Sequence, residues 1–184
     1  MSTDSTTSGF IAPNTSPAPI EDQDLDRFLQ QYVSAITGVS GDLVRPRWQP
    51  DPPNQPGIDV TWIALGVSGR NPETFAAELH ADDGQSSVTY RLEDLDVLVS
   101  FFGPGMGAAY ARFRDGLSLA QNREALTLSG FGLIELTPPI TAPALLNERW
   151  QKRIDTTLRL RRGVAHRYAV LSIGSPNLTI TTDH

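Results

Sequence analysis

Apolar residues recur at helical spacing in two segments of the chain. Between residues 22 and 37 they follow the i, i+3, i+4, i+7 spacing of an amphipathic helix, at Leu25, Phe28, Leu29, Tyr32, Val33 and Ile36. Asp22 or Asp24 can cap its start, and Gly38 stands where a left-handed residue ends a helix. A second helix is predicted from Met106 to Leu117, with an end or kink at Asp115-Gly116, and a short helical turn over 122–128.

Alternation of apolar and polar residues predicts strands in the rest of the chain. Residues 59–68 and 74–80 read as strands, with a hairpin turn at Asp82-Asp83-Gly84. A long strand is expected over 87–102, with a register shift at Glu93-Asp94, although a helical start at Leu92 also fits. Residues 131–136 form another strand. Alternation over 154–161 and a bend at Arg162-Gly163 predict a C-terminal hairpin that returns through 165–173.

The order of these elements predicts one α+β domain, an antiparallel or mixed β-sheet flanked by two to three helices. Residues 1–20 are rich in Ser, Thr and Pro and form a flexible N-terminal arm, with Phe10 and Ile11 as its anchors if it lies on a neighbour. The domain covers 21–175 and residues 176–184 form a tail. Five prolines within 44–57 require an extended segment, in which Trp48 should dock in a groove of this subunit or the next.

Composition describes an ordinary acidic protein with uneven charge. The chain has 184 residues, no cysteine and a net charge of -6. Residues 1–100 carry 15 acidic against 5 basic residues, whereas residues 101–184 carry 6 against 10, so the two halves attract each other. Fourteen of the 15 basic residues are arginine, which suits interface ion pairs but also follows from a G+C-rich genome. No signal peptide or membrane span is expected, so we expect a soluble protein.

The candidates for chemistry are weak, and we expect no enzyme, no cofactor and no metal site. Gly103-Pro-Gly-Met-Gly107 does not have the G-x-G-x-x-G spacing of a dinucleotide site and reads as a strand-to-helix turn. The acids Glu93, Asp94 and Asp96 alternate across one strand, which favours an acidic ridge over a cation site. The histidines lack any zinc spacing, so a site built from His80, His166 and the acids is the least supported function.

A basic run near the C-terminus is the strongest charge feature. Between residues 149 and 167 it holds Arg149, Lys152, Arg153, Arg159, Arg161, Arg162 and Arg167. It could contact DNA phosphates, pair with the acidic ridge of a neighbouring subunit, or be solvated. We favour the subunit interface, because a nucleic-acid module would interleave stacking aromatics or present a recognition helix, and only Trp150 and Tyr168 are near. The alternative is a DNA-binding accessory protein that uses the basic hairpin, whose affinity would fall steeply with salt.

Four ordered blocks of sequence resemble the phage neck terminator family, a branch of the tail terminators of tailed bacteriophages. They begin at Leu43-Val-Arg-Pro-Arg-Trp-Gln-Pro and continue at Val99-Ser-Phe-Phe-Gly-Pro-Gly. The third block comprises Phe113-Arg-Asp-Gly-Leu with Ala120-Gln-Asn-Arg-Glu, and the fourth is Leu146-Asn-Glu-Arg-Trp-Gln-Lys-Arg-Ile-Asp. The resemblance covers about residues 25–175.

The resemblance implies a structural subunit of the head-to-tail joint, assembled in the host cytoplasm and placed in the neck of the virion. It implies a homo-hexameric ring that caps the tail tube, with sheath protein as an optional further partner, and that docks to the head-side connector. Genomic DNA would pass through the lumen without specific binding, and no membrane is involved. As subunit contacts we expect a clamp of Arg45, Arg47 and Trp48, the acids Glu93, Asp94 and Asp96, and the arginines Arg153, Arg159, Arg161, Arg162 and Arg167.

Overall fold

The structure is a computed structural model that describes residues 5–6, 9–14, 19–51, 53–80, 84–146 and 148–171. Within these residues three α-helices are present, α1 (Asp22–Thr37), α2 (Met106–Leu117) and α3 (Ala120–Leu128), besides a 3-10 turn at Gly41–Leu43. The strands are β1 (Val44–Pro46), β2 (Trp62–Pro72), β3 (Ala77–His80), β4 (Ser87–Phe102), β5 (Phe131–Leu136), β6 (Ile140–Leu146) and β7 (Arg149–Tyr168).

The strands form one seven-stranded mixed sheet in the order β1-β2-β4-β7-β5, with β3 paired to β4 and β6 paired to β7. β1 runs parallel to β2, whereas β2 runs antiparallel to β4, and β5 and β6 run antiparallel to β7. Side-chain contacts join Ser100 to Asp155, Asp96 to Arg159 and Asp94 to Arg161. Along these contacts the residue numbers decrease on β4 while they increase on β7, so β4 and β7 are also antiparallel. The α+β prediction is confirmed.

The contacts of the chain gather in two compact units, and strands β4 and β7 contribute residues to both. The larger unit contains residues 20–72 and 92–163, with all three α-helices. The smaller unit contains residues 1–19, 73–91 and 164–184. Each unit is described separately below.

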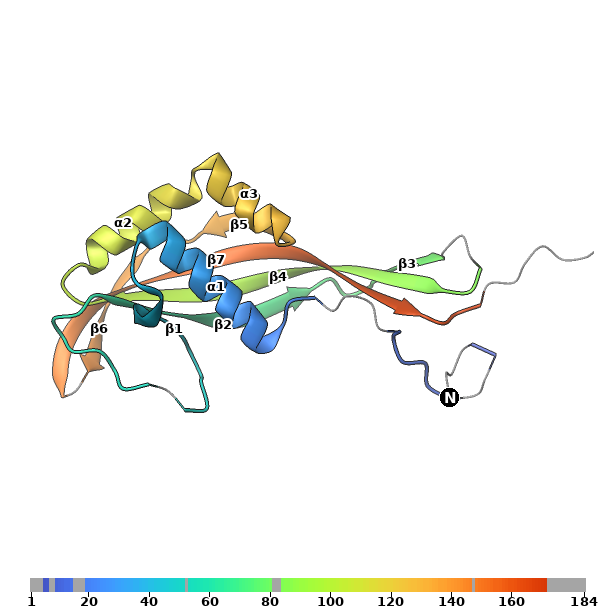
Figure 1. The fold of residues 1–184 in the computed structure, drawn as a ribbon, viewed down its shortest axis with the longest axis horizontal. Helices are drawn as coiled ribbons and strands as arrows, with labels where there is room; N and C mark the ends of the chain where they lie inside the picture. Colours follow the sequence, from blue (N-terminus) through green and yellow to red (C-terminus); the bar gives the residue numbers. More distant parts are fainter. Residues whose placement is uncertain are drawn as a thin grey trace, which may run out of the picture. The chain divides into compact units, whose positions relative to one another are not determined.

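In the larger unit, the three helices cover one face of the sheet (Figure 1). Odd-numbered β4 residues point into the core beneath them, at Leu95, Val97, Val99 and Phe101, and all four are fully buried. From α1 the core takes Leu25, Leu29 and Val33, the residues that helical spacing predicted. In the part of the chain that the structure describes, the other face of this sheet has no helix.

The boundaries of α1 and α2 follow from backbone geometry. Glu21, and not Asp22 or Asp24, is the N-terminal cap residue of α1, and its side chain makes no capping bond. Gly38 ends the helix with φ 68°, as predicted. Gly103, with φ 84°, makes the turn from β4 into α2, which confirms the strand-to-helix reading of the glycine cluster. α2 continues through Asp115-Gly116 to Leu117.

In the smaller unit, β3 and the start of β4 form a hairpin in which His80 lies opposite Ser87. The predicted turn residues Asp82 and Asp83 lie outside the described residues. Two described residues of the N-terminal segment contact the end of β7: Asn14 N donates to Arg167 O over 2.6 Å, and Ser5 N donates to Ala169 O over 3.0 Å. This segment therefore has a place to pair along β7.

The prediction of a C-terminal hairpin is wrong. β7 runs unbroken through Arg162 and Gly163, because the Arg162 side chain packs on the buried face against acidic partners and does not mark a solvent turn. Sequence reasoning also missed β6, because Pro143 within it argues against a strand. Proline is tolerated there because β6 lies at the edge of the sheet, paired to β7.

Two details of β4 also differ from expectation. Leu92 starts no helix, since β4 is continuous from Ser87 to Phe102. The register shift occurs on the partner strand, between Val67 and Gly69 of β2, and not at Glu93-Asp94. The extra, unpaired residue therefore lies on β2, and not on β4, which carries the acidic ridge.

Candidate interaction face

The helix-free face of the sheet in the larger unit is lined by charged side chains that pair across β4 and β7. Asp94 accepts from Arg161 Nε over 2.7 Å and from Arg161 Nη2 over 3.0 Å, a bidentate pair. Arg159 donates to Asp96 over 2.8 Å and to Glu135 of β5 over 2.7 Å. Acids of the first half of the sequence thus pair with Arg159 and Arg161 of the second half inside one chain.

These pairs shift the titration of their members. The Arg161 guanidinium, through its hydrogen bond and its charge, lowers the pKa of the Asp94 carboxyl from its ordinary value. Asp96 raises the pKa of Arg159, again through a hydrogen bond and the opposite charge. Both shifts favour the charged forms of Asp94 and Arg159. We call Asp94, Asp96, Glu135, Arg159 and Arg161 the charged ladder.

A second polar group lies farther along the same face. Arg47 Nη2 donates to Ser100 Oγ over 2.5 Å, Ser100 Oγ donates to Asp155 Oδ1, and Arg153 Nε donates to Asp155 Oδ2 over 2.8 Å. Burial lowers the pKa of Arg47, and Arg153 adds to the shift, while Asp155 opposes it. Arg47 Nε is buried without a hydrogen-bond partner among the described residues. Arg47 therefore fixes the Pro-rich segment to the sheet.

Arg162 and Glu93 lie on the opposite, helix-covered face. The Arg162 side chain is only 3% exposed and donates to Glu93 Oε2 over 2.8 Å, to Ile20 O over 2.7 Å and to the Glu21 carboxylate. Arg70 reaches the same Glu21 over 2.9 Å. This buried network joins the start of α1 to the sheet, so Arg162 and Glu93 act inside the subunit.

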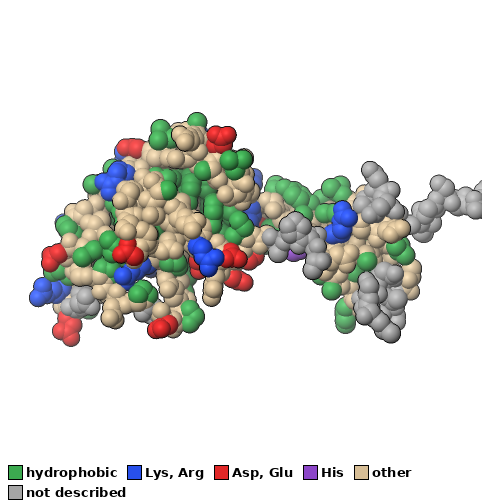
Figure 2. Space-filling model, in the orientation of Figure 1, with side chains coloured by type: hydrophobic (Ala, Val, Ile, Leu, Met, Phe, Trp, Pro, Cys, Tyr) green, Lys and Arg blue, Asp and Glu red, His purple; other side chains and the backbone are tan. Residues whose placement is uncertain are grey.

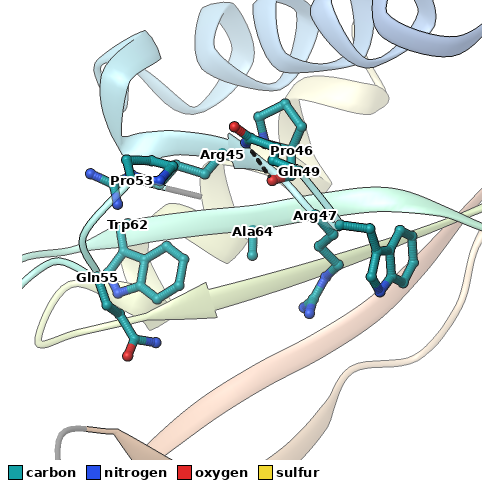
Figure 3. Close-up of a pocket in the computed structure, with 9 residues that line it drawn as sticks. Arg45, Pro46, Arg47, Gln49, Pro53, Gln55, Trp62 and Ala64 are labelled. Atoms are coloured by element: carbon teal, nitrogen blue, oxygen red, sulfur yellow. Dashed lines mark hydrogen bonds between the residues drawn. The ribbon is translucent and has the colours of Figure 1, made fainter. Parts of the chain in front are cut away.

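Trp48 is one of the residues that line a groove of about 440 Å³ formed by the Pro-rich segment over β2. Trp62, Ala64 and Arg47 point off the same side of the sheet beneath it, away from the helices (Figure 3). A Cβ atom on Gly66 would lie 2.7 Å from Trp48 Cζ3, so one side of the indole rests on that glycine. Trp48 is nevertheless 70% exposed and has φ 57°. The indole is held in place while most of its surface faces outward.

Arg45 holds this segment in shape. Its Nε donates to Asp42 O over 3.1 Å and its Nη1 donates to Asn54 O over 2.6 Å. Gln49 Nε2 adds a bond to Pro46 O over 2.7 Å, drawn as the dashed line in Figure 3. Arg45, which was expected to contact a neighbouring subunit as part of the clamp, therefore stabilises the conformation of its own segment.

Other expected site residues are more scattered. Arg167 is exposed in the smaller unit, where its carbonyl accepts from Asn14. His80 Nδ1 contacts Ser87 Oγ over 2.7 Å, and the His166 carbonyl accepts from Thr89. In the described part of the chain, no three His, Asp or Glu side chains are arranged to hold a metal ion. None of the described helices combines the length and the apolar composition required to cross a bilayer.

Sequence reasoning missed several residues of this face. Ser100 and Asp155 were not singled out, although Asp155 alternates with Arg153 and Arg159 on the polar side of β7. The exposed apolar side chains of β6 and the start of β7 were missed because β6 was not recognised. They are Ile140, Leu145 and Trp150.

Comparison with known families places this chain. The family described as phage neck terminator protein matches residues 23–183, most of the chain. This confirms the resemblance seen in the four sequence blocks. No curated protein matches the sequence.

Proposed function

This chain belongs to the phage neck terminator protein family, whose members have a structural role in the neck of the virion, and from that premise we propose that it is a ring-forming subunit of the head-to-tail joint. In this proposal six copies form a closed ring that caps the tail tube and binds the head-side connector. Sheath protein is an optional further partner. The ring assembles in the host cytoplasm, and genomic DNA passes through its lumen without specific binding.

The family match over residues 23–183 carries this proposal. The fold supports it through its asymmetry. One face of the sheet is closed by helices, while the other presents a charged ladder and an anchored, exposed tryptophan. Exposed aromatic side chains are enriched at interfaces and depleted on ordinary surfaces. A surface of this kind fits a subunit that is buried between neighbours.

Among the expected interface residues, those with accessible side chains remain candidates for contacts between copies. They are Trp48, Arg161 and Arg167, which are exposed, and Arg45, Arg47, Arg153, Arg159, Asp94 and Asp96, which are half-buried. Arg162 and Glu93 already satisfy each other inside the subunit. The ladder can still meet a neighbour, because its outward edges are not covered by a helix.

Mass photometry and gel filtration of the full chain, alone and with isolated tail tubes, test the ring. We expect a species of six copies of the 20.0 kDa chain, and a ring at the end of the tube in electron micrographs. A chain that stays monomeric in solution and also fails to bind tubes contradicts the proposal. An Arg114→Glu variant on the outer side of α2 serves as a control that should assemble normally, since its only described ion pair is with the adjacent Asp115.

A further inference from the structure

Two exposed surfaces of the larger unit carry opposite charge, and each includes an exposed tryptophan. The first is formed by β6 and the start of β7, where Leu145 lies directly opposite Trp150 in the strand register. Trp150 is 73% exposed and Leu145 is 58% exposed. Lys152 lies two residues beyond Trp150, on the same side of the strand, and is exposed as well. We call Leu145, Trp150 and Lys152 the apolar-basic face.

The second surface is a groove of about 680 Å³ between α1 and the Pro-rich segment. Trp48 and Pro50 supply its apolar part, and Asp22, Asp26 and Asp51 supply its charge. Its one basic residue, Arg27, pairs with Asp24 over 2.8 Å. Burial raises the pKa of Asp26, and the nearby charge of Asp22 adds to the shift. We call it the acidic groove.

The two surfaces lie on different sides of the unit. Within the larger unit, Figure 1 places β6 and the start of β7 at the end away from the start of α1, and Figure 2 shows acidic side chains near the start of α1 and both basic and acidic side chains at the other end. Two different, complementary patches on one chain form a heterologous contact, and such a contact closes into a ring when the rotation between neighbours is right. A two-fold dimer would instead require one patch that complements itself.

We infer that the apolar-basic face of one subunit docks into the acidic groove of the next copy in the ring. Trp150 would lie against Trp48 and Pro50, and Lys152 would pair with the carboxylates of Asp26 and Asp51. Desolvated tryptophans at the centre of an interface supply most of its affinity, and flanking charges of opposite sign set orientation and the choice of partner. This inference rests on the proposed ring and specifies which surfaces form it.

The absence of cysteine from the sequence allows a direct test by disulfide trapping. Two single variants, Lys152→Cys and Asp51→Cys, are mixed in equal amounts and oxidised mildly. We expect the 152–51 heterodimer to form faster than either homodimer. The variant carrying both cysteines should give a ladder of cross-linked species that ends at the ring size. Arg114→Cys mixed with Asp51→Cys is the matched control for random collision.

Substitution of the charges provides a second arm. Lys152→Glu should raise the concentration needed for assembly by about 10-fold or more, as should Trp150→Ala. Asp26→Lys combined with Lys152→Glu should recover part of the loss, because the reversed charges attract again. Circular dichroism must show native folding for each variant; Trp150→Phe replaces Trp150→Ala if the latter does not fold.

The outcomes separate this contact from the ring itself. If the wild-type chain assembles but the 152–51 pair cross-links no faster than the Arg114→Cys control, the contact is wrong and the ring stands. If the wild-type chain assembles neither in solution nor on tail tubes, both the ring and the contact are wrong. Fast 152–51 cross-linking with rescue by the reciprocal charge swap supports the contact.

Discussion

Arg162 carries its charge on the buried face of β7, where its neighbours along the strand are Leu158 and Leu160. A buried charge is tolerated only when its partners are close and numerous, since removal from water costs several kcal/mol per ion. Glu93, Glu21 and the Ile20 carbonyl provide those partners. At the residue scale, therefore, this arginine links the sheet to the start of α1.

Replacement of Arg162 with methionine should lower the free energy of unfolding by about 3 kcal/mol, because the half-buried Glu93 carboxylate loses its close partner and keeps only Arg70, at 3.8 Å. Urea unfolding followed by circular dichroism measures the loss. The double variant Arg162→Met with Glu93→Leu should be more stable than Arg162→Met alone, since no unpaired charge remains on Glu93. A double variant that is less stable than the single one would contradict this account.

Tyr32 provides a test of burial through pH. Burial raises the pKa of Tyr32 to about 12, above the ordinary 10.0, and its hydroxyl donates to Asn122 O over 3.1 Å. Because the folded-state pKa is raised, the contribution of this group is complete below pH about 10 and is lost as the pH rises towards 12.

Two measurements on Tyr32→Phe check this. At neutral pH the variant should be less stable by about 1 kcal/mol, the usual value of one hydrogen bond. In an ultraviolet titration of the phenolate, the difference between wild type and variant should show one tyrosine that ionises well above the ordinary value of 10.0. If the missing tyrosine titrates near 10, Tyr32 is not buried as described.

At the scale of elements, the junction of β4 and α2 depends on a left-handed backbone conformation that residues with a side chain rarely adopt. Gly103 has φ 84°, and a Cβ atom there would lie 2.1 Å from the Val60 carbonyl oxygen. The neighbour is backbone and cannot move aside cheaply. The end of β4 therefore packs directly against the backbone of the segment before β2.

Gly103→Ala should destabilise the protein by about 2 kcal/mol or more, from the left-handed backbone conformation together with the contact at Val60. The matched control is Gly107→Ala, four residues later in α2, where an added Cβ meets nothing within 4 Å. Alanine in a helix is favoured over glycine by up to about 1 kcal/mol, so this variant should be neutral or stabilised. Equal losses in thermal unfolding would contradict the assignment of the turn.

At the scale of the whole molecule, charge is distributed so that the acidic and basic halves of the chain meet in the sheet. Arg159, Arg161 and Arg162 are engaged by acids of β4, and Arg153 is engaged by Asp155. Few arginines of the basic run are left to neutralise phosphates. This distribution favours an assembly subunit over a DNA-binding accessory protein.

Duplex DNA should accordingly bind weakly to the isolated chain, with a dissociation constant no tighter than about 1 µM at physiological salt, the range of non-specific binding. Fluorescence anisotropy at several salt concentrations measures both affinity and slope. A nanomolar affinity with preference for one sequence would favour the DNA-binding alternative.

Much of the fold could be predicted from the pattern of the sequence. The α1 stripe, the strand over 87–102, the second helix and the strand over 131–136 follow from local spacing, because each buries one regular face. The charge difference between the two halves was also visible from composition. What composition could not show is that the opposite charges meet within one chain, since that requires the register of β4 against β7.

The remaining features depend on contacts between distant segments, and only the tertiary structure decided them. In the sequence Arg162-Gly163 looks like a turn, but in the structure Arg162 pairs with Glu93 and Glu21 and the strand continues. Likewise β6 looks like a loop in the sequence, but it pairs with β7 at the edge of the sheet. The position of the exposed Trp48 against Gly66 is likewise a contact between distant segments that the sequence did not show. Periodicity reports which face of an element is buried, whereas the partner of a charge or an edge is set by strand order, which no local pattern encodes.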